Sequence, residues 1–89
     1  MPELRATPAG ERTFQVETTI DGRRHAWRVG VPPELAARLA TDPESVAKAT
    51  IAFLLDREPP GSILAAFECS VVPGYFPEYE AKLPGYLRR

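Results

Sequence analysis

Hydrophobic and polar residues alternate in the segment TFQVETTI, from Thr13 to Ile20. A period of two predicts a β-strand with one buried face. Asp21-Gly22 follows, and this pair is typical of the two-residue turn of a β-hairpin, in which both residues adopt positive φ. The segment RRHAWRVGV then predicts the returning strand.

The turn also predicts the register of this hairpin, because a two-residue loop fixes which residues lie opposite each other. In that register the apolar residues of both strands share one face, while the other face carries polar side chains. The predicted pairs on the apolar face are Ile20–Arg23, Thr18–His25, Val16–Trp27 and Phe14–Val29.

Helical signals follow the hairpin. Pro33 suits the first turn of a short helix that runs through Ala40. Asp42 is a good N-cap for a second helix, with Pro43 at its first position and an end near Arg57. This second helix is apolar around nearly its whole circumference. Because a chain of 89 residues has little else to cover it, we expect a second subunit to bury the Val46–Leu55 surface.

Two more helices are expected near the C-terminus. Ser62 can cap the segment ILAAFE, and Pro77 can begin a helix over PEYEAKL that stops before Pro84-Gly85. Each Pro-Gly pair of the C-terminal region suits a type II turn. The predicted fold class is α+β, with an N-terminal antiparallel β-hairpin followed by three to four short helices packed on its apolar face. Residues 1–12 are expected to form a flexible arm, and residues 13–89 a single domain.

The stretch PGYFPEYEAKLPGYL, residues 73–87, leaves two interpretations open. In the first, Tyr75, Phe76, Tyr79 and Leu83 form a lid that folds onto the other helices, and Phe76, Tyr79 and Leu83 recur at helical spacing. Tyrosines are also common at protein interfaces, so the same stretch can bind a partner. The candidate interface residues, from this stretch and the apolar helix, are Phe53, Leu54, Tyr75, Phe76, Tyr79, Tyr86 and Leu87.

The composition argues against several partners. Eleven lysine and arginine residues balance twelve aspartate and glutamate residues, for a net charge of −1. This balance provides no long-range attraction to nucleic acid or to anionic lipid. A single cysteine, Cys69, fits a reducing compartment, and no run approaches the length of a membrane span. We therefore expect a cytoplasmic protein that binds neither membrane nor nucleic acid.

The residue types that usually carry catalysis are sparse. His25, the one histidine, falls on the apolar face of the hairpin, and Cys69 lies far from it in the sequence. We expect His25 to pack or hydrogen-bond and Cys69 to be a small core residue. No close spacing of ligand residues predicts a metal site, and no glycine-rich loop predicts phosphate binding. The sequence therefore predicts a protein that is not an enzyme and has no cofactor.

One alternative is a helix-turn-helix DNA-binding regulator built from residues 34–50. Ala36, Ala40 and Val46 have the small, turn and apolar spacing of that motif. Ala40 stands where glycine is usual. The would-be recognition helix offers few polar groups to DNA, among them Ser45, Lys48 and Thr50, before it becomes apolar.

The segments FLLDREPPGSIL and YFPEYE resemble those of a family of short, uncharacterised bacterial proteins. The resemblance covers roughly residues 13–83 and includes the hairpin start. It supports the architecture and implies no activity, cofactor or catalytic residue. The function predicted from the sequence is a non-catalytic protein–protein interaction or regulatory module that acts as a homo-oligomer, with a homodimer expected and a different protein partner also possible.

Overall fold

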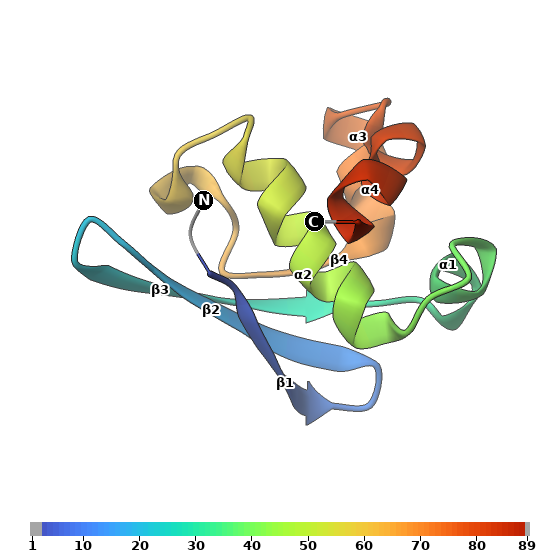
Figure 1. The fold of residues 1–89 in the computed structure, drawn as a ribbon, viewed down its shortest axis with the longest axis horizontal. Coiled ribbons are helices and arrows are strands. Elements are labelled where there is room, and N and C mark those ends of the chain that lie inside the picture. Colours follow the sequence, from blue (N-terminus) through green and yellow to red (C-terminus); the bar gives the residue numbers. More distant parts are fainter. Residues whose placement is uncertain (1–2, 89) are drawn as a thin grey trace.

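The computed structural model of the chain describes residues 3–88. Its sheet contains β1 (Arg5–Gly10), β2 (Thr13–Ile20), β3 (Arg23–Gly30) and β4 (Ala66–Glu68), in that spatial order. β1, β2 and β3 are antiparallel, and β4 runs parallel to β3. The helices follow the first three strands and pack on one face of the sheet, so the fold is α+β (Figure 1).

The predicted hairpin is confirmed, including its register. β2 and β3 pair with Val16 opposite Trp27 and with Phe14 opposite Val29. At the turn, Asp21 has φ 52° and Gly22 has φ 79°, the positive values that a type I′ turn requires at both central positions. The match between turn type and hydrophobic alternation fixes which face of this hairpin is buried.

The expected N-terminal arm needs correction. Arg5–Gly10 forms strand β1, which pairs with β2 from Arg5 opposite Glu17 onward. The segment RATPAG has no strong alternation of its own, because Ala6 is the one apolar residue in it that packs against the core. Its strand conformation comes from the neighbouring strand. Residues 1 and 2 of the expected arm lie outside the described residues.

The helix expected over ILAAFE is also wrong. After a short 3-10 turn, η1 (Pro60–Ser62), the chain extends and joins the sheet as β4. Phe67 pairs with Val29 on the face that α2 covers. Alanine, leucine and glutamate favour a helix locally, but pairing with β3 satisfies the backbone of this segment and places the Phe67 ring against the core.

The helices expected from Pro33 and from the Asp42 cap are present. α1 spans Pro33–Arg38 and α2 spans Pro43–Leu55. Asp42 caps α2, because its Oδ1 accepts a hydrogen bond from the Ser45 backbone N–H at 2.8 Å. The chain then continues through η2 (Cys69–Val71), α3 (Val72–Tyr75) and α4 (Tyr79–Leu87). No helix among the described residues is long and apolar enough to cross a membrane.

The connection from α1 to α2 is a Schellman turn built on alanine. The N–H of Ala40 donates to Ala37 C=O and the N–H of Thr41 donates to Ala36 C=O, both at 3.1 Å. Ala40 has φ 54°, the left-handed conformation that usually requires glycine at this position. The turn position of the helix-turn-helix pattern is therefore a strained helix end.

The Pro-Gly pairs do not form the type II turns that their sequence suggests. Pro73 and Gly74 lie inside α3, and α4 continues through Pro84 to Leu87. A type II turn needs positive φ at glycine, and among the described glycines positive φ occurs at Gly10 and Gly22. Packing of the residues beyond Pro84 on the core keeps α4 helical there.

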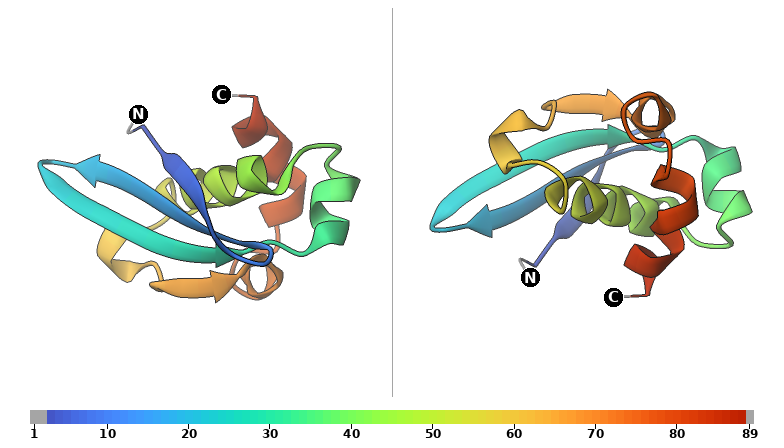
Figure 2. Two further views of the ribbon diagram at one scale, coloured as in Figure 1. Left: turned by 90° about the horizontal axis from the view of Figure 1, so that it is seen from below. Right: turned by 90° about the horizontal axis from the view of Figure 1, so that it is seen from above.

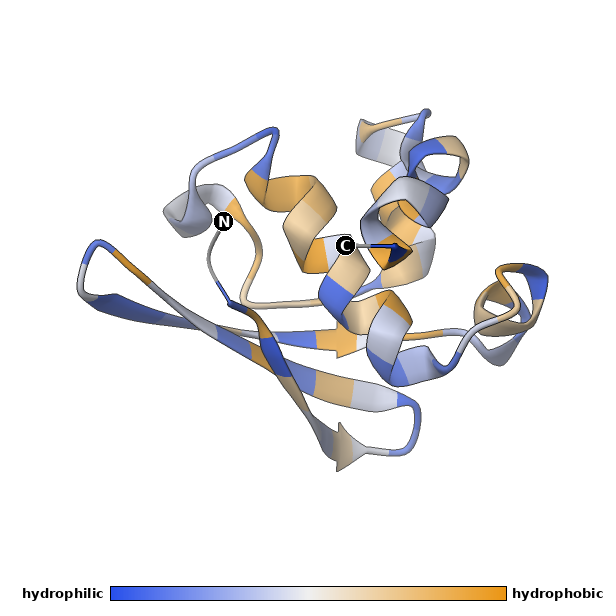
Figure 3. Ribbon diagram, in the orientation of Figure 1, coloured by the Kyte–Doolittle hydropathy of each residue, from blue (hydrophilic) through white to orange (hydrophobic). Residues whose placement is uncertain are grey.

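Helix α2 is the centre of the core. It packs against β1 and β2 on one side and against α4 on the other (Figures 1 and 2). Figure 3 shows that apolar residues occupy most of its length. Its buried residues are Val46, Ala47, Ala49, Thr50, Ile51, Ala52, Phe53 and Leu54. The chain itself therefore covers this helix, and the expectation that Val46–Leu55 needs a second subunit for burial is corrected.

Two substitutions test the positive-φ positions as a matched pair. Ala40→Gly removes the side chain from a left-handed residue, so we expect the free energy of unfolding to rise by about 1 kcal/mol. Gly22→Ala adds a side chain at φ 79° and should lower it by about the same amount. Urea unfolding followed by circular dichroism measures both. A loss of stability in Ala40→Gly would contradict the Schellman turn.

Candidate protein-binding groove

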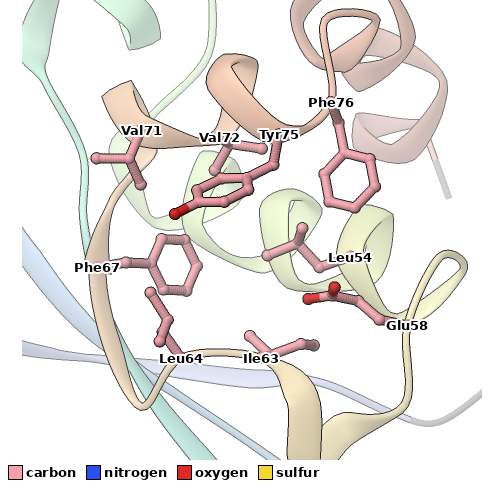
Figure 4. Close-up of a pocket in the computed structure, with 9 residues that line it drawn as sticks. All are labelled: Leu54, Glu58, Ile63, Leu64, Phe67, Val71, Val72, Tyr75 and Phe76. Carbon is pink, nitrogen blue, oxygen red and sulfur yellow. The ribbon is translucent and has the colours of Figure 1, made fainter.

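The placement of α2 leaves a hollow on the same side of the sheet. α2 lies over β1 and β2, so the β4 side of the sheet receives less cover from it. The chain closes this side only partly, with η1 at one end of the hollow and η2 and α3 at the other. The result is an apolar groove of about 320 Å³ between β4, the end of α2 and α3 (Figure 4).

Nearly all the residues that line this groove are apolar. β4 and the segment before it form one wall, the end of α2 forms the opposite wall, and η2 and α3 form the upper rim (Figure 4). The lining residues are Leu54, Glu58, Ile63, Leu64, Phe67, Val71, Val72, Tyr75 and Phe76. We call this site the groove.

The large apolar side chains that the described chain exposes gather at this one place. Leu64 is 61% exposed, Val71 44% and Tyr75 73%, and all three line the groove. Single exposed apolar residues are common on proteins, whereas a cluster around a hollow marks a binding surface. In water this cluster leaves apolar area exposed that a partner can bury.

Glu58 is the one charged residue in the lining of the groove. It follows the end of α2, where its N–H donates to Leu54 C=O at 2.9 Å. Figure 4 shows its carboxylate directed toward the groove. The groove therefore joins an apolar surface to a single negative charge at its α2 side.

An aromatic cluster centred on Phe53 supports the groove from inside. The Phe53 ring makes edge-to-face contacts with Phe76 and Tyr79, with ring centroids 5.9 and 5.3 Å apart. It also contacts Tyr86 at 5.7 Å, and the Arg57 guanidinium lies 3.7 Å from the Phe53 ring centroid. Edge-to-face pairs and a cation over a ring are both favourable, so this cluster fixes α4 and the start of the C-terminal segment on α2.

Polar contacts around Arg57 hold the same helices together. Arg57 Nε donates to Glu78 Oε2 at 3.1 Å, and its Nη1 donates to the Tyr86 hydroxyl at 3.2 Å. The Tyr86 hydroxyl donates in turn to Asp56 at 2.6 Å. Arginine is suited to such a site because its planar group stacks and donates several hydrogen bonds at once. The groove wall formed by the end of α2 is thereby fixed.

The interior also contains a small network of polar side chains around Thr50. Its hydroxyl donates to Val46 C=O at 2.8 Å, lies 2.7 Å from the Tyr79 hydroxyl and 3.6 Å from Cys69 Sγ. Burial raises the pKa of the Cys69 thiol and the pKa of Tyr79. A buried thiol with a raised pKa is unreactive at neutral pH. Cys69 is therefore a core residue, as the sequence predicted.

The structure divides the predicted interface residues into three places. Leu54, Tyr75 and Phe76 line the groove. Phe53 and Tyr79 are fully buried within the chain. Tyr86 and Leu87 are partly buried against the core on α4. For Phe76, Tyr79 and Leu83, the lid interpretation is confirmed, because all three pack into or against the core. For Tyr75 it is wrong, because this side chain is 73% exposed.

Sequence reasoning missed most of the groove. Ile63, Leu64 and Phe67 were assigned to a helix, and Val71 and Val72 were given no role. The sequence signal for the groove is the group of apolar residues in the segments ILAAF and SVVPGY. These residues indicate a groove only when Ala66–Glu68 is known to pair with β3 as an edge strand.

The other residues considered for catalysis or DNA binding pack or form hydrogen bonds within the chain. His25 stacks on Trp27, with ring centroids 5.9 Å apart and an interplanar angle of 9°, as expected for a packed histidine. In the helix-turn-helix interpretation, Thr50 was one of the groups available to DNA, but its side chain is 0% exposed. Ser45 is engaged at the α2 cap, where its hydroxyl contacts Asp42 Oδ2 at 3.1 Å.

Comparison of the chain with protein-family models, with curated proteins and with solved structures found no match. The groove is therefore interpreted from its own geometry. The resemblance to short bacterial proteins stays a prediction.

The buried thiol and phenol predict a decline of stability at alkaline pH. Their folded-state pKa values are raised, so the stability they contribute is complete below the unfolded thiol pKa of about 8.5 and is lost as pH rises above it. We expect the free energy of unfolding to fall between pH 8 and 10 because of Cys69, by up to about 1.4 kcal/mol per pH unit, and Tyr79 to add a similar slope only above its unfolded pKa of about 10. Urea titrations at several pH values measure this.

Cys69→Ala is the matched variant for this measurement. It removes the thiol and leaves Tyr79, so its stability should decline less steeply between pH 8 and 10. The same pH dependence in both proteins would contradict a buried, protonated Cys69.

Proposed function

We propose that this chain is a protein–protein interaction module that acts without catalysis, and that it binds through the groove. The observation that carries this proposal is the convergence of Leu64, Val71 and Tyr75, the exposed large apolar residues of the described chain, on one hollow. Interface centres are apolar and rich in tyrosine and phenylalanine, with few charges. The groove has this composition.

The partner that the surface supports best is a second copy of the chain. Tyr75 projects beside a hollow whose volume is about 320 Å³. A projecting side chain next to a hollow is self-complementary about a twofold axis, because each copy can place its side chain against the hollow of the other. The net charge of −1 adds little repulsion between copies.

The residue types that line the groove also favour binding over catalysis. Apart from Glu58, its lining offers the Tyr75 hydroxyl as a polar side-chain group. A nucleophile with a neighbouring base, which covalent catalysis requires, is not among these lining residues. The site is therefore suited to apolar contact.

The DNA-binding alternative has less support than the groove, because most of its recognition helix is buried in the core. α2 is the central core helix of the chain, whereas a recognition helix presents polar side chains to the major groove. That alternative stays a prediction. A mobility shift of duplex DNA that weakens steeply with salt would favour it over the groove.

Two groove variants test the proposed self-association. Leu64→Ser and Tyr75→Ser replace exposed apolar side chains, so neither removes a buried core residue. We expect the wild-type chain to be dimeric at tens of micromolar, and each variant to raise the dimer dissociation constant at least about tenfold. Sedimentation equilibrium measures the constant, and circular dichroism checks the fold.

Ala81→Ser is the matched control, because Ala81 is exposed on α4 away from the groove lining. It should leave the dissociation constant unchanged. A wild-type chain that remains monomeric at 100 µM and above would refute the second copy as the partner.

A further inference from the structure

The groove lies beside a free edge of the sheet. β4 is the last strand in the spatial order, and its partner is β3. Arg28 N–H donates to Ala65 C=O at 2.8 Å, and with the parallel register this directs the N–H and C=O of Phe67 toward β3. The N–H and C=O of Ala66 and the N–H of Glu68 therefore point outward. The C=O of Glu68 is engaged instead, because Glu68 is the N-cap residue of η2 and an N-cap C=O accepts the first hydrogen bond of the turn. Figure 2 shows β4 at the margin of the sheet.

The outward groups of β4 are available for pairing. Within residues 3–88, no backbone hydrogen bond outside the regular elements uses the N–H or C=O of Ala66 or the N–H of Glu68. Both residues are exposed. An exposed strand edge with unused backbone groups is a template for pairing with another strand.

The opposite edge of the sheet is less suited to this role. β1 contains Pro8, which has no N–H to donate, and its register with β2 shifts between Pro8 and Gly10. Proline and bulges on edge strands prevent further pairing. β4 has neither feature in its three residues. The two edges therefore differ, and β4 is the one open to a strand.

We propose that two copies of the chain pair their β4 strands antiparallel across a twofold axis, so that the two sheets become one continuous sheet. This inference rests on the proposed function, because it takes the second copy to be the partner of the groove. It adds the way in which the copies bind and the residues that meet at the axis.

The outward groups fix the register of this pairing. The Glu68 N–H of one copy donates to the Ala66 C=O of the other, and the symmetric pair does the same. Phe67 then lies opposite Phe67 of the second copy, on the side that carries the helices. Directly opposed aromatic residues on neighbouring strands stabilise a sheet. This pair brings the β4 walls of the two grooves together, next to Leu64 and Val71 of each copy.

The other face of the continuous sheet shows charge complementarity. Arg28 lies beside Ala66 in the β3–β4 register, and Glu68 of the second copy lies on the far side of the same Ala66. Arg28 and Glu68 take part in none of the ion pairs of the described chain. Within one copy the Glu68 carboxylate lies over Gly30. The Cα atoms of Arg28 and the second copy's Glu68 are about 10 Å apart, two strand spacings, so the two side chains meet above the small Ala66 once Glu68 turns from Gly30 toward the axis.

This arrangement also avoids repulsion between like charges. In the proposed register each Glu68 faces an alanine of the other copy. Each copy contributes one arginine and one glutamate, so two equivalent ion pairs form across the axis. A second copy therefore fits this edge in charge as well as in hydrogen bonding.

A charge-exchange cycle tests the pairing. In sedimentation equilibrium we expect Arg28→Glu and Glu68→Arg each to raise the dimer dissociation constant at least about tenfold, because like charges then face each other. The double variant should return it to within about threefold of wild type. Arg23→Glu, an exposed charge change near the hairpin turn, is the control and should have no effect. Single and double variants with equal dissociation constants would overturn the proposal.

A second measurement tests the strand register directly. In a Cys69→Ala background, Phe67→Cys places two thiols opposite each other, where Cα atoms about 4.5 Å apart permit a disulfide. We expect mild oxidation to join the copies. Ala65→Cys is the control, because its two thiols are offset by about 13 Å along the strands. Equal cross-linking of both variants, or none with Phe67→Cys, contradicts this register.

The outcomes separate this inference from the proposed function. If Leu64→Ser and Tyr75→Ser weaken the dimer while the charge exchange and the Phe67→Cys trap show no effect, the groove binds the second copy and β4 pairing is wrong. If wild type is a monomer, both proposals fail. A weakened dimer in the single charge variants, recovery in the double variant and a Phe67→Cys disulfide together support β4 pairing.

Discussion

The structure depends on one constraint, which is the need to cover helix α2. This helix is apolar on nearly every side, and a chain of 89 residues must bury it with short elements. The sheet covers one side through β1 and β2, and α4 covers another. Phe53 is the centre of the contact between α2 and the C-terminal segment, because Phe76, Tyr79, Tyr86 and the Arg57 guanidinium all contact its ring. The C-terminal aromatic residues are thus first of all a cover for α2.

Covering α2 on these sides leaves the β4 side of the sheet incompletely covered. The segment from Ile63 to Val72 has to turn from the sheet edge to α3 there, and its apolar side chains line a groove that the chain does not fill. A small domain has few elements with which to close such a hollow. The same geometry leaves the β4 edge unpaired, so the apolar groove and the free strand edge occur together. This coincidence connects the proposed binding function with the fold.

Local patterns predicted the elements whose signals are strong and short in range. The hairpin follows from Asp21-Gly22 and the alternation around it, and α2 follows from the Asp42 cap and a continuous apolar run. β1 and β4 were missed, because their residues adopt strands only beside a partner strand, and the alanines of RATPAG and ILAAFE carry little preference for a sheet. Pro84 suggested a helix end, yet the contacts of Tyr86 with Asp56 and Arg57 keep the last turn of α4 in place.

The sequence by itself determined the hairpin with its register, the helices that begin at Pro33 and Pro43, the packed roles of His25 and Cys69, and the packing of Phe76, Tyr79 and Leu83 on the core. Each depends on neighbours in the chain or on an apolar pattern that one element carries. Only the tertiary structure decided where the exposed apolar surface lies. Leu64 precedes β4, Val71 belongs to η2 and Tyr75 to α3. They converge because α2 occupies the β1–β2 side of the sheet while β4 pairs with β3. A non-local strand pairing of this kind leaves no periodicity in the sequence, so the groove appears only once the chain is folded.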